Sequence, residues 1–165
     1  MTRTPVVFID GEAGTTGLGI RDRLASLPVA LHSIDPAHRK DPSARKEAMA
    51  AADLVVLCLP DDASREAEAM AATMGDNAPR LLDASTAFRT APNWVYGFPE
   101  LEAGQAGAIA SAPRVSNPGC YPTGAIGLLR PLFDAGVLLV IGKASGWEKG
   151  SIPVVHAIFI SNAIS

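Results

Sequence analysis

The stretch VVFIDGEAGTTG, residues 6–17, places a short run of β-branched and aromatic residues directly before a glycine loop. An apolar run that stops at a glycine is typical of a buried parallel strand. The next residues, 18–27, carry Leu and Ile mainly at helical spacing until Pro28. The order of strand, glycine turn and helix is the beginning of a βαβ unit, so this stretch predicts an α/β fold.

Apolar strand patterns and helical patterns go on alternating after this unit. We predict strands at 30–34, 54–59 and 81–83, helices at 43–52, 62–70 and 123–132, and two further strands at 137–141 and 154–160. The expected fold is a doubly wound, mostly parallel Rossmann-type sheet in a dinucleotide-binding domain, residues 1–115. The incomplete start of an α+β catalytic domain would follow in residues 116–165.

Composition excludes several classes of partner. The 165 residues include 14 Lys+Arg and 17 Asp+Glu, and a net charge of -3 gives no basic surface for nucleic acid. No apolar run approaches the ~20 residues of a membrane span, and the N-terminus lacks a signal-peptide pattern. Two cysteines without a CxxC or Cys/His cluster predict neither a disulfide framework nor a metal site. We expect a cytoplasmic protein with a small-molecule substrate.

The glycine loop is a candidate for binding a dinucleotide. Gly11, Gly14 and Gly17 form a GxxGxxG pattern in which backbone N–H groups and the helix dipole can hold a pyrophosphate, beside Thr15 and Thr16. The alternative is a tight turn in which Thr15 or Thr16 only caps the helix. The position of the loop after the first strand favours cofactor binding.

Polar residues after the second predicted strand bear on the choice of cofactor. Asp35 lies near the position at which an acidic residue contacts an adenosine ribose, and Ser33 is a neighbouring candidate. Residues 38–40, His-Arg-Lys, follow at once, and the guanidinium of Arg39 could bind the 2′-phosphate of NADP. A solvated loop that ends in a helix cap is the alternative. The pattern gives NADP a slight preference over NAD.

The two cysteines have different sequence surroundings. Cys58 belongs to the predicted strand 54–59, and free cysteine packs well in cores, so we interpret it as structural. Cys120 follows a Pro-Gly turn, and Pro122 is typical of the first turn of a helix. A helix N-terminus favours the nucleophilic thiolate, although a helix-capping cysteine without chemistry is an equal alternative. A nucleotide-binding unit with an activated thiol indicates a thioester-forming dehydrogenase.

Five segments, taken together, resemble the shorter type of N-acetyl-gamma-glutamyl-phosphate reductase, a family of arginine biosynthesis. They occur in the family's order, between residues 6 and about 136, and are 8–17, 58–62, 83–86, 94–101 and 116–123. The resemblance implies a semialdehyde dehydrogenase-type oxidoreductase. In such an enzyme Cys120 attacks N-acetyl-glutamyl 5-phosphate, phosphate leaves, and NADPH reduces the thioester to the semialdehyde.

The resemblance also implies roles for residues around the thiol. Asn117 and backbone N–H groups near Cys120 would bind the developing oxyanion. Arg89 would bind the substrate phosphate, with a surface ion pair as its alternative. Pro60 would lie beside the nicotinamide. The aromatic segment 94–101 would fold against the active site or serve as plain packing.

The last residues depart from the resemblance. Enzymes of this family continue for about as many residues again, through a Gly-Tyr-Ser-Gly segment and a histidine that acts as general acid and base. Residues 137–165 show neither, and we assign His156 to a strand. We therefore expect a truncated or frame-altered reductase of impaired activity, which would be a homo-oligomer if its catalytic domain were complete. The alternatives are a nucleotide-binding remnant and an enzyme like aspartate-semialdehyde dehydrogenase.

Overall fold

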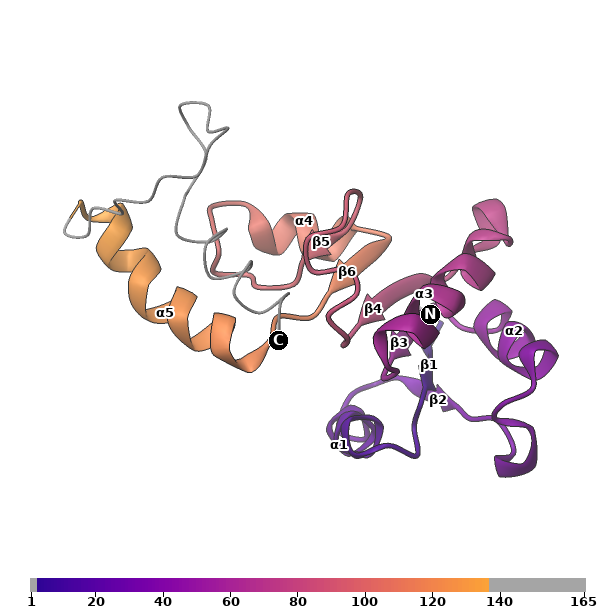
Figure 1. Cartoon of the computed structure of the whole chain (residues 1–165). Helices are drawn as coiled ribbons and strands as arrows, with labels where there is room; N and C mark the ends of the chain where they lie inside the picture. The colour runs from indigo at the N-terminus through magenta and orange to yellow at the C-terminus, as the bar shows by residue number, and fades with distance from the viewer. Residues whose placement is uncertain (1–2, 137–165) are drawn as a thin grey trace.

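The computed structural model describes residues 3–136. Six parallel strands form one sheet in the order β2-β1-β3-β4-β6-β5 (Figure 1). The strands are β1 (Val6–Asp10), β2 (Ala30–His32), β3 (Leu54–Leu57), β4 (Arg80–Asp83), β5 (Val95–Tyr96) and β6 (Arg114–Ser116). The α-helices are α1 (Thr15–Leu24), α2 (Pro42–Ala50), α3 (Asp61–Ala72), α4 (Gln105–Ser111) and α5 (Cys120–Asp134), with short 3-10 turns η1 (Pro36–His38) and η2 (Gly75–Asn77).

The predicted doubly wound parallel sheet is confirmed. From β1 the chain passes through α1 to β2 on one side, and then crosses back through α2 to β3 on the other side. This reversal creates a topological switch point between β1 and β3, and ligands of open α/β sheets bind at the carboxyl ends of the strands there. We therefore expect a ligand site at the loops that follow β1 and β3.

Element boundaries differ from the sequence-based expectation at several places. β2 ends at His32 and β3 at Leu57, each two residues earlier than predicted, although the N–H of Cys58 still donates to the carbonyl oxygen of Asp10 in β1. Helix α1 begins already at Thr15 and α5 already at Cys120. The sequence reading missed α4, β5 and β6, which are too short to show a periodic pattern. The predicted domain boundary after residue 115 falls inside β6 and stays a prediction.

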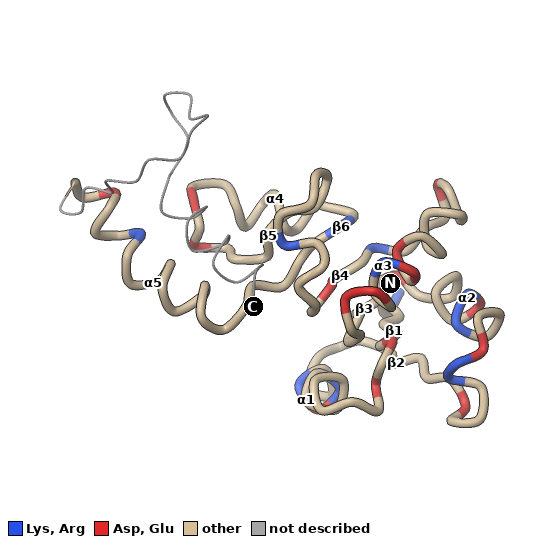
Figure 2. The backbone as a smooth tube through the Cα atoms, viewed as in Figure 1, with Lys and Arg blue, Asp and Glu red and all other residues tan. Residues whose placement is uncertain are grey.

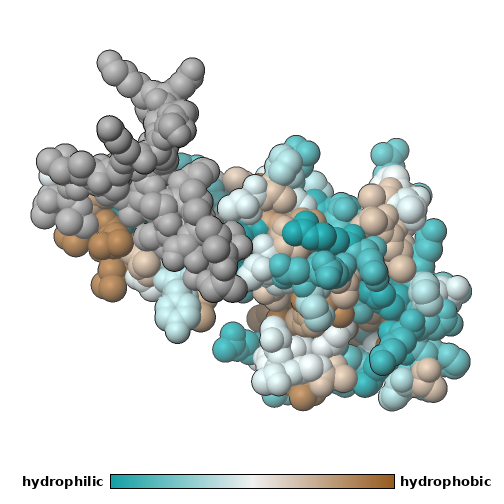
Figure 3. All heavy atoms as spheres, in the orientation of Figure 1, coloured by the Kyte–Doolittle hydropathy of each residue, from teal (hydrophilic) through white to brown (hydrophobic). Residues whose placement is uncertain are grey.

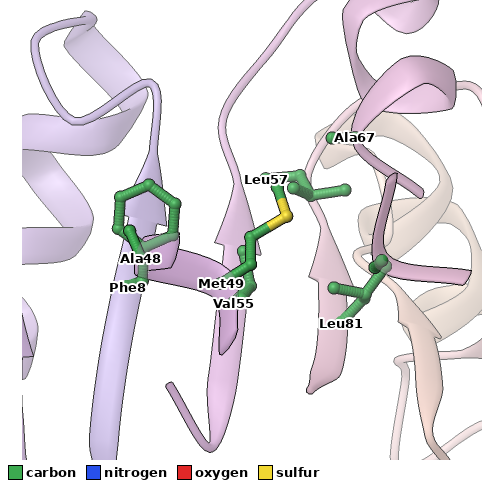
Figure 4. Packing of buried hydrophobic residues seen from close by; sticks show 8 residues of the cluster. Phe8, Ala48, Met49, Val55, Leu57, Ala67 and Leu81 are labelled. Carbon is green, nitrogen blue, oxygen red and sulfur yellow. The ribbon is translucent and has the colours of Figure 1, made fainter. Parts of the chain in front are cut away.

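One face of the sheet carries the main hydrophobic core, which α2 and α3 cover (Figure 4). Met49 of α2 is fully buried among side chains of the central strands, including Phe8 and Leu57. Helix α3 contributes Ala67 and Ala71, whose small side chains allow its backbone to lie close to the sheet. This core fixes β1 and β3 as neighbours and so positions the loops at their carboxyl ends.

A second and smaller cluster joins the aromatic segment to α5. Tyr96 and Ile126 are buried together, with Phe98 and Leu101 packed against them. Trp94 instead stacks on Phe88, with ring centroids 4.1 Å apart. Each alternative for the aromatic segment therefore holds for a part of it. Trp94 serves as packing away from this cluster, whereas Tyr96, Phe98 and Leu101 pack against the helix that begins with Cys120.

The described residues contain no helix with the length and apolarity that a bilayer crossing requires. The strands predicted at 137–141 and 154–160, together with His156, lie outside the described residues.

Candidate functional site

The glycine loop after β1 needs glycine for steric reasons. Gly11 has a φ of +91°, and a Cβ there would lie 2.3 Å from the carbonyl oxygen of Cys58. A Cβ on Gly17 would lie 2.4 Å from the carbonyl oxygen of Gly11. The loop is therefore packed tightly between α1 and the end of β3, as a close backbone approach at the switch point requires.

The start of α1 leaves backbone donors available. Gly14 is the N-cap residue and no side chain caps the helix, so the alternative in which Thr15 or Thr16 is the cap is wrong. Both threonines lie exposed in the first turn. The first N–H groups of a helix have no intrahelical acceptor, and together with the dipole they suit an anion such as a pyrophosphate.

A cavity of about 360 Å³ opens beside this loop, on the side of α2 and α3. The end of β1, residues 11–13, Arg39, Lys40, Leu59 and Ala63 contribute to its lining. The volume lies in the range of small-molecule sites. Gly11 and Arg39 are the predicted cofactor residues that line it.

Glu12 is the main feature of this cavity that the sequence reading missed. Its carboxylate is buried and accepts hydrogen bonds from Ser33 Oγ at 2.8 Å, Arg39 Nη2 at 3.1 Å and Arg21 Nη1 at 3.2 Å. The structure thus brings the predicted residues Ser33 and Arg39 together. The signal available in the sequence was a charged residue between two glycines of the loop.

Asp35 lies outside the lining of this cavity, and its contact with a ribose stays a prediction. Its exposed carboxylate accepts from the backbone N–H of Ala37 and caps the short η1 turn, and it does not line the cavity. The carboxylates that do line the cavity are those of Glu12 and of Asp10, which forms a 2.7 Å ion pair with Arg45. The sequence reading missed this ion pair as well, because it joins residues 35 positions apart.

A second cavity of about 310 Å³ lies between α1 and the other face of the sheet. Thr15, Thr16, Ala84 and Asn117 are among its lining residues. It thereby links the beginning of α1 with the loop that precedes the thiol. Pro60, exposed at the N-cap of α3, lines neither cavity, and its place beside a nicotinamide stays a prediction.

Cys120 is the first residue of α5, and its side chain is exposed. The N-cap Gly119 makes no side-chain cap, and the buried Pro122 occupies the first turn as predicted. Asn117 is held in place from both ends: its N–H donates to the carbonyl oxygen of Asp83 at 2.7 Å, and its Nδ2 donates to that of Pro118 at 3.1 Å. The loop therefore fixes the thiol at the carboxyl edge of the sheet.

Arg89 lies directly against this helix start. A Cβ on Gly119 would be 2.7 Å from Arg89 Nη1, so the guanidinium lies next to the backbone that begins α5. The Arg89 Nε is buried and has no hydrogen-bond partner among residues 3–136. Within the same residues Arg89 belongs to no ion pair, which disfavours the surface-pair alternative. A guanidinium with unused donors near a thiol suits a phosphate-bearing substrate.

Cys58 has the opposite environment. It follows β3 and is half-buried. Burial raises its pKa to about 11, and the nearby charges of Asp10 and Asp83 act in the same direction. The structural interpretation of this cysteine agrees with these surroundings, because a thiol so disfavoured as thiolate is a poor nucleophile.

The parallel sheet, its switch point and the glycine loop define a Rossmann-type nucleotide-binding domain. The sequence profile of the family described as "Semialdehyde dehydrogenase, NAD binding domain" matches residues 19–109, more than half of the chain. The chain belongs to this family. The description supports a nicotinamide cofactor.

Curated relatives are more specific in name. The chain is 51% identical to an N-acetyl-gamma-glutamyl-phosphate reductase of Burkholderia cenocepacia over 96% of its own length and 52% of the relative. It is 54% identical to N-acetyl-gamma-glutamyl-phosphate reductase 2 of Pseudomonas putida, over 93% and 50%. The chain thus spans about half the length of these relatives. Because the first alignment omits only 4% of the chain, it extends past residue 136, where the sequence-based resemblance ended.

Solved structures agree on the fold. Aspartate semialdehyde dehydrogenase II of Vibrio cholerae, complexed with ASA, superposes with a TM-score of 0.60 at 16% identity, over 81% of this chain and 47% of that one. Aspartate semialdehyde dehydrogenase of Francisella tularensis gives a TM-score of 0.59 at 14% identity, over 81% and 42%. At this identity the likeness concerns the fold alone.

Proposed function

We propose that this chain carries the nucleotide-binding site and the nucleophile of an NADPH-dependent reductase. The reaction converts N-acetyl-glutamyl 5-phosphate to N-acetyl-glutamate 5-semialdehyde and phosphate, a step of arginine biosynthesis in the cytoplasm. The observation that carries the proposal is the exposed thiol of Cys120 at a helix start against which the guanidinium of Arg89 lies. The names of relatives at about 50% identity supply the substrate.

The chain's own part in the chemistry begins with the thiolate of Cys120. Its sulfur attacks the acyl carbon of the mixed anhydride, the bond from that carbon to the phosphate oxygen breaks, and phosphate leaves with the electron pair. Arg89 binds the phosphate before it leaves. The N–H groups of Cys120 and Tyr121, which lack intrahelical acceptors in the first turn, and the amide of Asn117 stabilise the developing oxyanion. The product of this step is a thioester on Cys120.

The dinucleotide is held by the first half of the chain. Gly11, Gly14 and Gly17 allow its pyrophosphate to approach the start of α1, beside Thr15 and Thr16. Ser33 and Arg39 would bind the 2′-phosphate of its adenosine, and Pro60 would lie toward the nicotinamide. When bound, the cofactor supplies the hydride that reduces the thioester.

We assign the general acid and base to a histidine outside residues 3–136. The histidines in that range, His32 and His38, belong to β2 and η1, in the nucleotide-binding half of the structure. We extend the proposal to a division into a dinucleotide-binding domain, 1–115, and a partial catalytic domain, 116–165. A homo-oligomer would then assemble around a complete catalytic domain. The alternative of a nucleotide-binding remnant without thiol chemistry predicts no acyl transfer.

The test is acyl transfer to the thiol, which does not require the rest of the reaction. Purified chain is mixed with N-acetyl-glutamyl 5-phosphate, and the intact mass and the phosphate released are measured. We expect one acyl group on Cys120 and one equivalent of phosphate. Cys58→Ser should behave like the unmodified chain, whereas Cys120→Ser should form no adduct. Phosphate release at an unchanged rate from Cys120→Ser would contradict the proposal.

A further inference from the structure

The side chain of Glu12 is buried although it belongs to the exposed glycine loop between Gly11 and Gly14. Its exposed fraction is 8%. The three donors that surround it come from three separate segments: Arg21 from α1, Ser33 from the loop after β2, and Arg39 from the segment after η1. One carboxylate therefore joins three segments of the chain, and of its three partners Arg39 lines the 360 Å³ cavity together with Glu12 itself.

The groups that hold Glu12 are those that a phosphate monoester would use. A hydroxyl and two guanidinium groups converge on one anion, which is the donor set expected around a phosphate dianion. Arg39 still has a buried Nε without a hydrogen-bond partner among residues 3–136, and it lines the cavity. The carboxylate thus occupies a donor of Arg39 that would otherwise be open to a phosphate in the cavity, and its other oxygen holds Ser33 and Arg21 next to it.

The charges around the cavity make this competition consequential. Of the charged residues lining it, Asp10 is paired with Arg45, and Glu12 is paired with Arg39, which leaves Lys40 as the remaining cation. A phosphate on Arg39 would lie within a few ångströms of the Glu12 carboxylate and be repelled by it. An adenosine ribose with a free 2′-hydroxyl carries no such charge and is not repelled.

We propose that Glu12 limits how strongly the chain prefers NADPH over NADH, because its carboxylate competes with the 2′-phosphate for Ser33 and Arg39. The inference rests on the proposed function in that a nicotinamide dinucleotide binds in this cavity. Glu12 is a specificity-determining residue with two effects. It keeps the phosphate-binding donors together in the free protein, and it makes NADPH bind more weakly than it would to the same donors without a carboxylate at this position.

The experiment compares NADPH and NADH affinities of three full-length chains by titration: the unmodified chain, Glu12→Gln and the control Glu102→Gln, which changes an exposed carboxylate in the loop before α4. Removing the Glu12 charge should tighten NADPH binding by roughly tenfold, since a unit charge in a partly buried site is worth at least that much. NADH affinity should change by less than about threefold, and Glu102→Gln should change neither affinity.

Either of two results would overturn the inference: parallel changes in both affinities, or weaker binding of NADPH by Glu12→Gln. If that variant does not fold, nuclear magnetic resonance on the unmodified chain replaces it. Adenosine 2′-monophosphate should shift the guanidinium signals of both Arg39 and Arg21, because Glu12 is displaced, and adenosine 5′-monophosphate should not. A shift of neither signal, or of Arg39 alone, overturns the inference.

The same measurements separate this inference from the proposed function. A chain that binds both dinucleotides but acquires no acyl group on Cys120 refutes the proposed function and leaves the role of Glu12 standing. A chain that is acylated on Cys120 and shows parallel changes for Glu12→Gln refutes the role of Glu12 alone. A chain that binds neither dinucleotide refutes both.

Discussion

The nucleotide-binding half of the structure and the half that carries the thiol are packed very differently. Around β1, β3 and β4, eight buried residues form one core, whereas Tyr96 and Ile126 are the buried members of the cluster under α5. Charged residues gather over the first half, and α5 carries only Arg130 and Asp134 (Figure 2). The main core is thus complete without α5. This helix follows β6 in the chain and packs on a smaller cluster.

The surface of α5 shows the same contrast. Tyr121 is 80% exposed and Leu128 is 73% exposed, and hydrophobic surface is visible in the region of this helix (Figure 3). The first half instead exposes mainly polar side chains in that view. The nucleotide-binding half is therefore stabilised by a core of its own. The thiol is positioned by a few contacts at the carboxyl edge of the sheet.

The largest expected difference between the halves is in thiol reactivity. With a pKa of about 11, Cys58 is a thiolate in roughly one molecule in a thousand at pH 8. Cys120 is exposed at a helix start. We expect iodoacetamide at pH 7.5 to label Cys120 at least ~100-fold faster than Cys58. Peptide mass spectrometry after timed quenching measures both rates.

The pH dependence provides the control for this comparison. Because the pKa of Cys58 is raised, its thiolate fraction, and with it the labelling rate, should grow about tenfold for each pH unit until pH approaches 11. The variant Cys120→Ser isolates this slow reaction. Equal labelling of the two cysteines at pH 7.5 would contradict the assignment of Cys58 to the core.

The next effect is steric and tests the glycine loop. In Gly17→Ala the new Cβ would meet the backbone of Gly11 and Glu12 at 2.4–2.6 Å, and backbone cannot move aside as a side chain can. We expect a loss of about 4 kcal/mol in the free energy of unfolding, measured with urea. The matched control is Gly19→Ala in α1, where nothing lies within 4 Å. It should gain about 0.5 kcal/mol through helix propensity. A similar small effect of both changes would mean that the loop is not closely packed.

A smaller effect should separate the two hydrophobic regions. Leu57→Ala removes a fully buried side chain from the core of the first half and should cost about 3 kcal/mol in the free energy of unfolding. Leu128→Ala on the exposed face of α5 should change it by less than about 0.5 kcal/mol. A large loss for Leu128→Ala would show that this face is covered in solution, and would weaken the contrast between the halves.

Much of the fold was predictable because it depends on local patterns. The apolar run of residues 6–10 and the glycine loop predicted the first βαβ unit. The Pro-Gly turn before Cys120 predicted the start of a helix. β5 and β6, of two and three residues, are stabilised by pairing with neighbouring strands. No period in the sequence reveals such short strands.

The candidate site was predictable in part, for a related reason. The role of residues within one loop, such as Gly11 and Gly17, can be predicted from their spacing alone. The role of Glu12 cannot be predicted in this way, because it depends on contacts with Arg21, Ser33 and Arg39, which only the folded chain brings together. Asp35 had the expected spacing for a ribose contact, but a nearby backbone N–H gave it a local use as a cap.

The smallest expected effect concerns the junction of the two halves. Asp83 ends β4, its backbone oxygen accepts from Asn117 of the thiol loop, and its buried carboxylate accepts from Ser85 Oγ at 2.6 Å. Burial raises the pKa of this carboxyl above its ordinary value of 3.8, although the Ser85 hydroxyl opposes the shift. A carboxyl whose folded pKa is raised contributes stability that is present below pH 3.8 and is lost as pH rises through the folded value.

Asp83→Asn should therefore remove one source of pH dependence from the free energy of unfolding, while the new side chain keeps the size and shape of the old one. We expect the variant to gain about 1 kcal/mol over the unmodified chain at pH 7, because no charge is buried, and to lose that advantage near pH 3.8. Urea unfolding at several pH values measures the difference, with the exposed Asp22→Asn as a control that should leave it flat. A variant less stable at pH 7 would show that the junction requires the charged carboxylate, and that the two halves are coupled more tightly than their packing indicates.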